Sequence, residues 1–272
     1  MIHMRFKSQH NNKLRGNLSP GDHHYKAFVG PPETYDLISA MQFNLLTLLG
    51  LREHHYLLDI GCGSLRAGRL FIPYLLPGHY FGIEPEQWLI EEGKKNELGR
   101  DIIALKNPVF SDDDNFTLTT FGRDFDFLLA QSIFSHTSQT QIERCFSQAK
   151  KCMKSTSVFV ATFVKGEKNY TGNKWVYPGC ATYTLEHMTG LAEKYGLVCK
   201  SINWPHPALQ TWILIFNPEN EKRILDISDI SRIPALEKER DFYKERVVIL
   251  EKHPYVKLGL KVNRFIKRIF RK

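Results

Sequence analysis

The residues best suited to chemistry lie in two short segments, residues 57–64 (Leu-Leu-Asp-Ile-Gly-Cys-Gly-Ser) and residues 80–85 (Tyr-Phe-Gly-Ile-Glu-Pro). Their pattern predicts a buried strand, a tight glycine turn, a helix, and a second buried strand that ends in a carboxylate, Glu84. In a parallel sheet this arrangement holds an adenosine-containing cofactor at the carboxyl edge. The spacing of the glycines and acids then indicates which cofactor.

A dinucleotide site requires a third glycine three residues after the second, so that the helix packs closely and faces a pyrophosphate. Arg66 stands at that position, and the next glycine is Gly68. Asp59 precedes the first glycine by two residues, where a carboxylate repels a pyrophosphate but suits a cationic amino-acid group. S-adenosyl-L-methionine carries an α-ammonium and a sulfonium. The spacing favours this cofactor over a dinucleotide, and a turn without a ligand is the other alternative.

The pattern Asp59-x-Gly61-x-Gly63 resembles motif I of the class I S-adenosylmethionine-dependent methyltransferases, and the resemblance covers about residues 35–217. It implies that Gly61, Cys62 and Gly63 form the cofactor-binding turn together with Asp59. It also implies that Glu84, at the end of the second strand, binds the ribose hydroxyls.

The same resemblance implies further cofactor contacts after the third and fourth strands. Gln131 follows the fourth strand and is expected to lie against the cofactor. Asp112 and Asp113 follow the third strand, where the family often contacts the adenine amino group. A solvated acidic turn is the alternative for these two aspartates.

Methyl transfer to a hydroxyl needs alignment of donor and acceptor and a base that removes the proton, without a metal or a covalent nucleophile. His136, in the segment after the fourth strand, is the first candidate base because an imidazole titrates near neutrality. The alternative is a histidine that caps the following helix. His206 is a second candidate base. We expect no metal site, since the histidines near residue 24 lack carboxylate or cysteine partners.

A long loop, residues 165–184, carries four aromatic side chains that are candidates for substrate binding: Tyr170, Trp175, Tyr177 and Tyr183. Aromatic rings on a loop above the cofactor edge stack on a sugar or another planar face. The alternative is that these rings pin the loop against the core.

The predicted fold is α/β, a Rossmann-like, mostly parallel sheet of seven strands. The expected strands are residues 56–60, 79–84, 102–105, 125–130, 157–164, 197–203 and 210–217. Helices are expected to alternate with the first six. A short proline-containing link joins the last two strands, which implies that the last strand is antiparallel.

The net charge of +8 is concentrated at one end of the chain. Residues 253–272 hold seven bases and no acid, so subtracting them leaves +1 for residues 1–252. A nucleic-acid enzyme usually places its positive charge around the active site, so nucleic acid is not the expected partner. The five cysteines form no C-x-x-C pair, and no apolar run reaches the roughly 20 residues of a membrane span, which favours a cytoplasmic protein.

Four segments follow from these patterns: an N-terminal segment or lid (1–30), the methyltransferase domain (31–218), a helical extension (219–252) and a basic amphipathic helix (253–272). Residues 230–252 have 3-4 apolar spacing, which predicts either a short coiled coil that makes a homo-oligomer or a helix on the core. The last helix suits an anionic membrane surface; docking on the domain and RNA binding are the alternatives.

The helical extension resembles that of membrane-peripheral enzymes of surface-glycan synthesis. The predicted function is therefore O-methylation of a sugar hydroxyl on a membrane-proximal or lipid-linked glycan, at the inner face of the cell membrane. The alternatives are O-methylation of a soluble small metabolite or natural product, and a catalytically inactive scaffold recruited to membranes.

Overall fold

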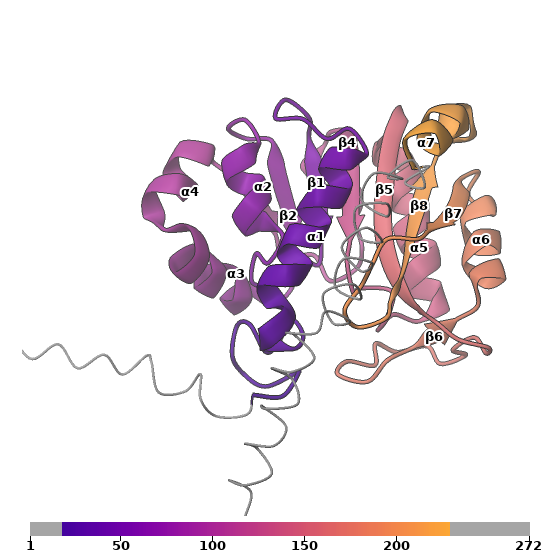
Figure 1. Cartoon of the computed structure of the whole chain (residues 1–272), viewed down its shortest axis with the longest axis horizontal. Helices are drawn as coiled ribbons and strands as arrows, with labels where there is room; N and C mark the ends of the chain where they lie inside the picture. The colour runs from indigo at the N-terminus through magenta and orange to yellow at the C-terminus, as the bar shows by residue number, and fades with distance from the viewer. Residues whose placement is uncertain (1–17, 229–272) are drawn as a thin grey trace, which may run out of the picture. The chain divides into compact units, whose positions relative to one another are not determined.

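The computed structural model describes residues 18–228, and its centre is a mixed sheet with the strand order β3-β2-β1-β4-β5-β8-β7 (Figure 1). The strands are β1 (Leu57–Ile60), β2 (Tyr80–Ile83), β3 (Val109–Ser111), β4 (Phe125–Ala130), β5 (Met153–Lys165), β7 (Val198–Ile202) and β8 (Thr211–Phe216). A two-residue strand, β6 (Thr182–Tyr183), pairs with the end of β5. The predicted α/β sheet of seven strands is confirmed.

The last strand, β8, is antiparallel to both of its neighbours, β5 and β7, as the short link before it implies. The neighbouring pairs among β3, β2, β1, β4 and β5 are all parallel. The carboxyl ends of β1, β2, β4 and β5 therefore meet at one edge of the sheet. In α/β sheets, ligands bind outside this edge, where the strand order reverses beside β1.

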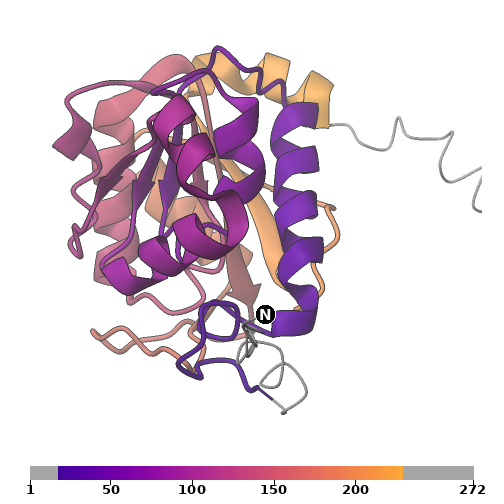
Figure 2. The ribbon, with the colours of Figure 1, turned by 90° about the vertical axis from the view of Figure 1, so that its left-hand side faces the viewer.

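Helices cover both faces of the sheet (Figures 1 and 2). One face packs against α1 (Tyr35–Leu48), α2 (Gly68–Tyr74) and α3 (Gln87–Gly93), and the other against α5 (Gln139–Cys152) and α6 (Leu185–Glu193). Because both faces are covered, central strands such as β4 are apolar almost throughout. The short helix α7 (Glu221–Ser228) follows β8.

The prediction of a strand at residues 102–105 is wrong. These residues belong to a helix, α4 (Arg100–Lys106), and the third strand is β3, which begins at Val109. Asp101 in the first turn and Lys106 in the last suit the helix dipole, and Asn107 ends the helix in a left-handed conformation. A four-residue apolar run has no periodicity that separates a strand from a short helix.

The predictions for residues 1–17, for most of the extension 219–252 and for the basic helix 253–272 lie outside the described residues. Within residues 18–228, none of the helices has the length and apolar character needed to cross a bilayer.

Candidate active site

The glycine turn after β1 forms the floor of the site. Gly61 and Gly63 have φ angles of +69° and +54°, a left-handed conformation that favours glycine. The amide groups of Gly61 and Cys62 donate to the Ile83 carbonyl at 2.8 and 3.0 Å, which ties the turn to the end of β2. Leu65 also has a positive φ, +60°, so the turn remains left-handed at a residue that is not glycine. The backbone amides thus stay close to the sheet edge.

Two buried carboxylates flank this turn. Asp59 is 3% exposed and accepts a 2.6 Å hydrogen bond from the Tyr80 hydroxyl. Glu84 is 8% exposed and accepts from the backbone amides of Gly63 and Glu86, both at 2.9 Å. Burial raises the pKa of Asp59 to about 6 and the pKa of Glu84 to about 7, because their ionised forms lose hydration. Neither forms an ion pair within residues 18–228.

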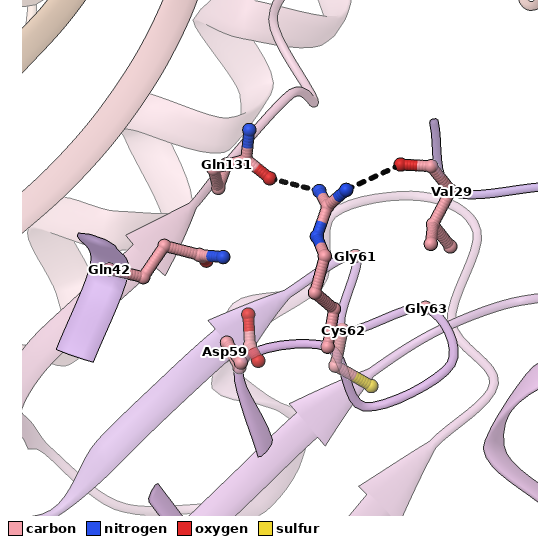
Figure 3. A pocket seen from close by; sticks show the side chains of 9 residues that line it. Val29, Gln42, Asp59, Gly61, Cys62, Gly63 and Gln131 are labelled. Atoms are coloured by element: carbon pink, nitrogen blue, oxygen red, sulfur yellow. Dashed lines mark hydrogen bonds between the residues drawn. The ribbon is translucent and has the colours of Figure 1, made fainter. Parts of the chain in front are cut away.

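Gly61 lines two cavities. The smaller, about 20 Å³, is lined by Val29, Gln42, Asp59, Gly61, Cys62, Gly63, Arg66, Ala67 and Gln131 (Figure 3). The larger, about 390 Å³, is lined by Ile60, Gly61, Ile83, Glu84, Pro85, Glu86, Asp113, Asp114, Phe116, Ile133, Gln141 and Trp175. Together their linings include Asp59 of β1, the glycine turn, and Glu84 directly after β2.

Seven of the eight residues predicted to bind the cofactor line one of these cavities. They are Asp59, Gly61, Cys62, Gly63, Glu84, Asp113 and Gln131. Asp112 is exposed and lines neither. The Asp113 carboxylate accepts from the backbone amides of Asn115 and Thr117 at 3.0 and 2.7 Å, so it also shapes its own loop.

Residues 18–30, which we term the strap, lie at the same end of the sheet as the loop 165–184 (Figures 1 and 2). Tyr177 of that loop donates a hydrogen bond to the Phe28 carbonyl. Phe28 also packs edge-on against Trp88 of α3, with ring centroids 5.3 Å apart. The Val29 side chain lies over Gly63, where an added Cβ would come within 2.7 Å of Val29 Cγ1. The strap therefore covers part of the glycine turn.

His136 has a defined tautomer. Its Nδ1 lies 2.7 Å from the Gly179 carbonyl oxygen, which only accepts, so Nδ1 carries the hydrogen and Nε2 keeps a lone pair. Its ring centroid lies 5.0 Å from that of Tyr177 and 5.5 Å from that of Trp175. Burial lowers the pKa of His136, and the hydrogen bond to the Gly179 carbonyl opposes this effect. The following helix, α5, is capped by Ser138 in a capping box, so His136 is not its cap.

His206 is 8% exposed and lies against Gln131, with 3.0 Å between the two Nε2 atoms. Its Nδ1 accepts from the Ala208 amide at 3.1 Å. Burial, with a smaller effect of Arg66, lowers its pKa to about 4. Both ring nitrogens are thus occupied by protein groups.

The four aromatic side chains of the loop 165–184 have different positions. Trp175 lines the larger cavity and is 44% exposed, and Tyr177 binds the strap. Tyr183 is fully buried and donates to the Thr137 carbonyl, and Tyr170 packs against the same core. The structure brings Trp175 and Tyr177 to the site, but not Tyr170 or Tyr183.

A partly buried hydrogen-bond network at the ends of β4, β5 and β8 was not predicted from the sequence. The Ser132 hydroxyl accepts from Gln131 at 2.7 Å and from Gln210 at 2.8 Å. Thr162 of β5 accepts from the Ser132 amide at 2.7 Å and donates to Gln210 at 2.6 Å. The one signal in the sequence is a threonine within the otherwise apolar run 158–164. Ser132 has a φ of +60°, a strained conformation common at functional sites.

No group of three or more histidine, cysteine, aspartate or glutamate side chains within residues 18–228 is arranged to hold a metal ion.

Searches with the chain match no family model and no curated protein. Solved structures do match. The glycopeptide N-methyltransferase MtfA with S-adenosyl-L-homocysteine is 8% identical with a TM-score of 0.51, covering 67% of this chain and 90% of that one. MtfA with S-adenosyl-L-methionine is 7% identical with a TM-score of 0.51, covering 66% and 93%. The DhpI–SAH complex is 14% identical with a TM-score of 0.50, covering 68% and 88%.

The similarity to these structures lies in the arrangement of the helices and strands. Because the sequence identities are low, the matches define the class of fold alone. The chain has the fold of the class I S-adenosylmethionine-dependent methyltransferases, with an antiparallel strand next to the end of the sheet. The resemblance inferred from the glycine turn and Glu84 is confirmed at the level of the fold, and the predicted cofactor and enzyme class agree with it.

Proposed function

We propose that the protein transfers a methyl group from S-adenosyl-L-methionine to a hydroxyl of a sugar on a membrane-proximal or lipid-linked glycan. The observation that carries the cofactor part is the pair of buried carboxylates, Asp59 and Glu84, on either side of the left-handed turn Gly61–Gly63. Each lines a different cavity, and the two cavities meet at Gly61.

The residues of both cavities fit this cofactor. Asp59 offers a carboxylate to an α-ammonium, and Glu84 offers carboxylate oxygens to ribose hydroxyls. The 390 Å³ of the larger cavity is within the usual range for small-molecule pockets, and the apolar side chains of Phe116 and Ile133 suit a flat base. When bound, the cofactor supplies an electrophilic methyl group. The residues of the chain hold the acceptor in line and remove its proton.

The proposed general base is His136. Its Nδ1 hydrogen is bound by the Gly179 carbonyl, so the lone pair of Nε2 is the side of the ring that receives a proton. Its neighbour Trp175 lines the larger cavity and offers an exposed ring face for stacking on a sugar. His206 is the less suitable base because its Nδ1 lone pair accepts from the Ala208 amide and its Nε2 faces the Gln131 side chain.

The membrane-proximal acceptor is proposed from the sequence of residues 253–272, with seven bases and no acid. Each base near an anionic surface contributes about 1 kcal/mol. The test is flotation of the full chain with vesicles that contain anionic lipid. Replacement of the seven bases by Gln should abolish flotation, and full flotation of that variant would contradict the membrane proposal. A homo-oligomer through residues 230–252 stays a prediction.

The acceptor is tested by incubating the protein with methyl-labelled S-adenosyl-L-methionine and separated cell fractions. Label in envelope glycolipid is the expected result, whereas label only in soluble metabolites would favour a soluble acceptor. Binding of S-adenosyl-L-homocysteine with no labelled product in any fraction would favour the inactive scaffold.

The base is tested with His136→Gln, which should lower kcat about 100-fold and leave the cofactor affinity unchanged. His54→Ala is the control, because His54 is an exposed histidine before β1, at the opposite edge of the sheet. A His136→Gln variant with unchanged kcat would show that His136 is not the base.

A further inference from the structure

Arg66 is a buried guanidinium with no carboxylate of residues 18–228 at ion-pair distance. It is 7% exposed and donates to two neutral oxygens, the Val29 carbonyl at 2.7 Å and the Gln131 side-chain carbonyl (Figure 3). None of the ion pairs within residues 18–228 includes it. Buried charges in proteins are normally paired, because the loss of hydration is costly. Arg66 thus resembles a group whose partner is a ligand.

The cavity beside Arg66 also contains Asp59, so it offers one cationic and one anionic group. Figure 3 shows the Asp59 carboxylate directed into this cavity, below the bonds that join Arg66 to Val29 and Gln131. Its 20 Å³ admits about one water molecule. A larger ligand must therefore displace a lining group, and the Val29 side chain of the strap and the Arg66 guanidinium are two such groups.

The bonding around Gln131 supports the same conclusion. Because a guanidinium only donates, the Gln131 side-chain oxygen faces Arg66 and its amide nitrogen faces His206 Nε2. His206 Nδ1 meanwhile faces the Ala208 amide, another donor. A neutral imidazole carries one N–H, so it cannot accept at both nitrogens. One of these hydrogen bonds is lost for as long as Gln131 is held by Arg66.

We infer that Arg66 is the receptor for the α-carboxylate of the cofactor's methionine moiety, and that it exchanges the Val29 and Gln131 oxygens for this carboxylate. The inference rests on the proposed function. Asp59, in the same cavity, receives the α-ammonium. A carboxylate presents two oxygens to the planar fork of the guanidinium, which matches them better than a single carbonyl does.

The exchange has consequences for the neighbours of Arg66. The Val29 carbonyl loses its hydrogen bond from Arg66, while Tyr177 still donates a hydrogen bond to the Phe28 carbonyl of the strap. Without Arg66, the Gln131 amide can turn if its nitrogen gives up its bond to the Ser132 hydroxyl. Its oxygen then accepts from His206 Nε2, and the Ala208 bond is kept. Capture of the carboxylate thereby relaxes both the strap and the hydrogen-bond network at the end of β4.

The test measures the Kd of the full chain, by titration calorimetry, for S-adenosyl-L-homocysteine and for its decarboxylated analogue, which keeps the ammonium. Arg66→Gln should raise the Kd for S-adenosyl-L-homocysteine about 10- to 100-fold, as expected for lost charge-assisted hydrogen bonds. The Kd for the decarboxylated analogue should change less than about twofold. Arg100→Gln, at an exposed position on α4, controls for the loss of one positive charge and should change neither.

Arg66→Lys keeps the charge without the fork and should raise only the Kd for S-adenosyl-L-homocysteine, by about 3- to 10-fold. If Arg66→Gln fails to fold, the Kd values of Arg66→Lys for the two ligands provide the same comparison. An equal increase in the Kd for both ligands would overturn the inference, because Arg66 would then only support the fold. Unchanged binding of S-adenosyl-L-homocysteine by both variants would overturn it as well. A wild-type chain that binds neither ligand would overturn the proposed function together with the inference.

Discussion

Cofactor binding should release protons near pH 6.5, because the two acids at the glycine turn are partly protonated in the free protein. Burial raises the pKa of Asp59 from 3.8 to about 6 and that of Glu84 from 4.5 to about 7. An ammonium beside Asp59 and ribose hydroxyls that donate to Glu84 favour the ionised forms, so both pKa values should fall on binding. The experiment therefore varies the pH and measures proton release and the Kd.

The size of the effect follows from the two pKa values. At pH 6.5, Glu84 is about three-quarters protonated and Asp59 about one-quarter, so together they hold about one proton. At pH 7.5 the two acids hold only about a quarter of a proton. The bound form carries fewer protons, so affinity rises with pH. Between pH 6 and 7.5 the Kd should fall about 15-fold if both acids are ionised in the complex.

The assay is titration of the full chain with S-adenosyl-L-homocysteine in two buffers of equal pH but different ionisation enthalpy. The difference in observed heat gives the number of protons released. We expect about one at pH 6.5 and about a quarter at pH 7.5. In Glu84→Gln only Asp59 still titrates, so release at pH 6.5 should fall to about a quarter. Equal heats in both buffers at pH 6.5, with binding intact, would show that binding releases no proton from Asp59 or Glu84.

Two further predictions concern buried hydrogen bonds. Tyr80→Phe removes the hydroxyl that donates to Asp59 at 2.6 Å, so it should lower the free energy of unfolding by about 1–3 kcal/mol in urea titrations and raise the pKa of Asp59. Ser132→Ala and Ser132→Gly both delete the hydroxyl that accepts from Gln131 and Gln210, but only glycine relieves the φ of +60°. The glycine variant should therefore be more stable by about 1–2 kcal/mol; equal stability would show that Ser132 is unstrained.

The part of the site that was predictable from the sequence is local in the chain. Asp59 lies near the end of β1, Gly61 and Gly63 follow that strand directly, and Glu84 comes directly after β2. Spacing alone therefore brings these residues to one edge of the sheet. The strand Phe125–Ala130 was also predicted with its observed bounds, because a run of six residues that is apolar except for Asp126 suits a central strand covered on both faces.

The part that was missed depends on contacts between distant segments. Thr162 meets Gln210 only because β8 runs antiparallel beside β5, which pairs Thr162 with Trp212. Arg66 was read as a departure from a glycine pattern, and its role depends on the strap, since Val29 is remote in sequence and has no motif of its own. No local sequence pattern predicts to which backbone carbonyl a buried guanidinium will donate a hydrogen bond.

The charges of the smaller cavity explain why a departure from the glycine pattern is compatible with cofactor binding. A third glycine would let a helix approach a pyrophosphate, but this turn has Leu65 in a left-handed conformation and then Arg66. The result is a buried cation facing the same small cavity as the buried acid Asp59. The two charges influence each other across the cavity, but neither forms an ion pair at contact distance within residues 18–228. A zwitterionic α-amino acid supplies both partners at once, whereas a pyrophosphate would satisfy Arg66 and repel Asp59.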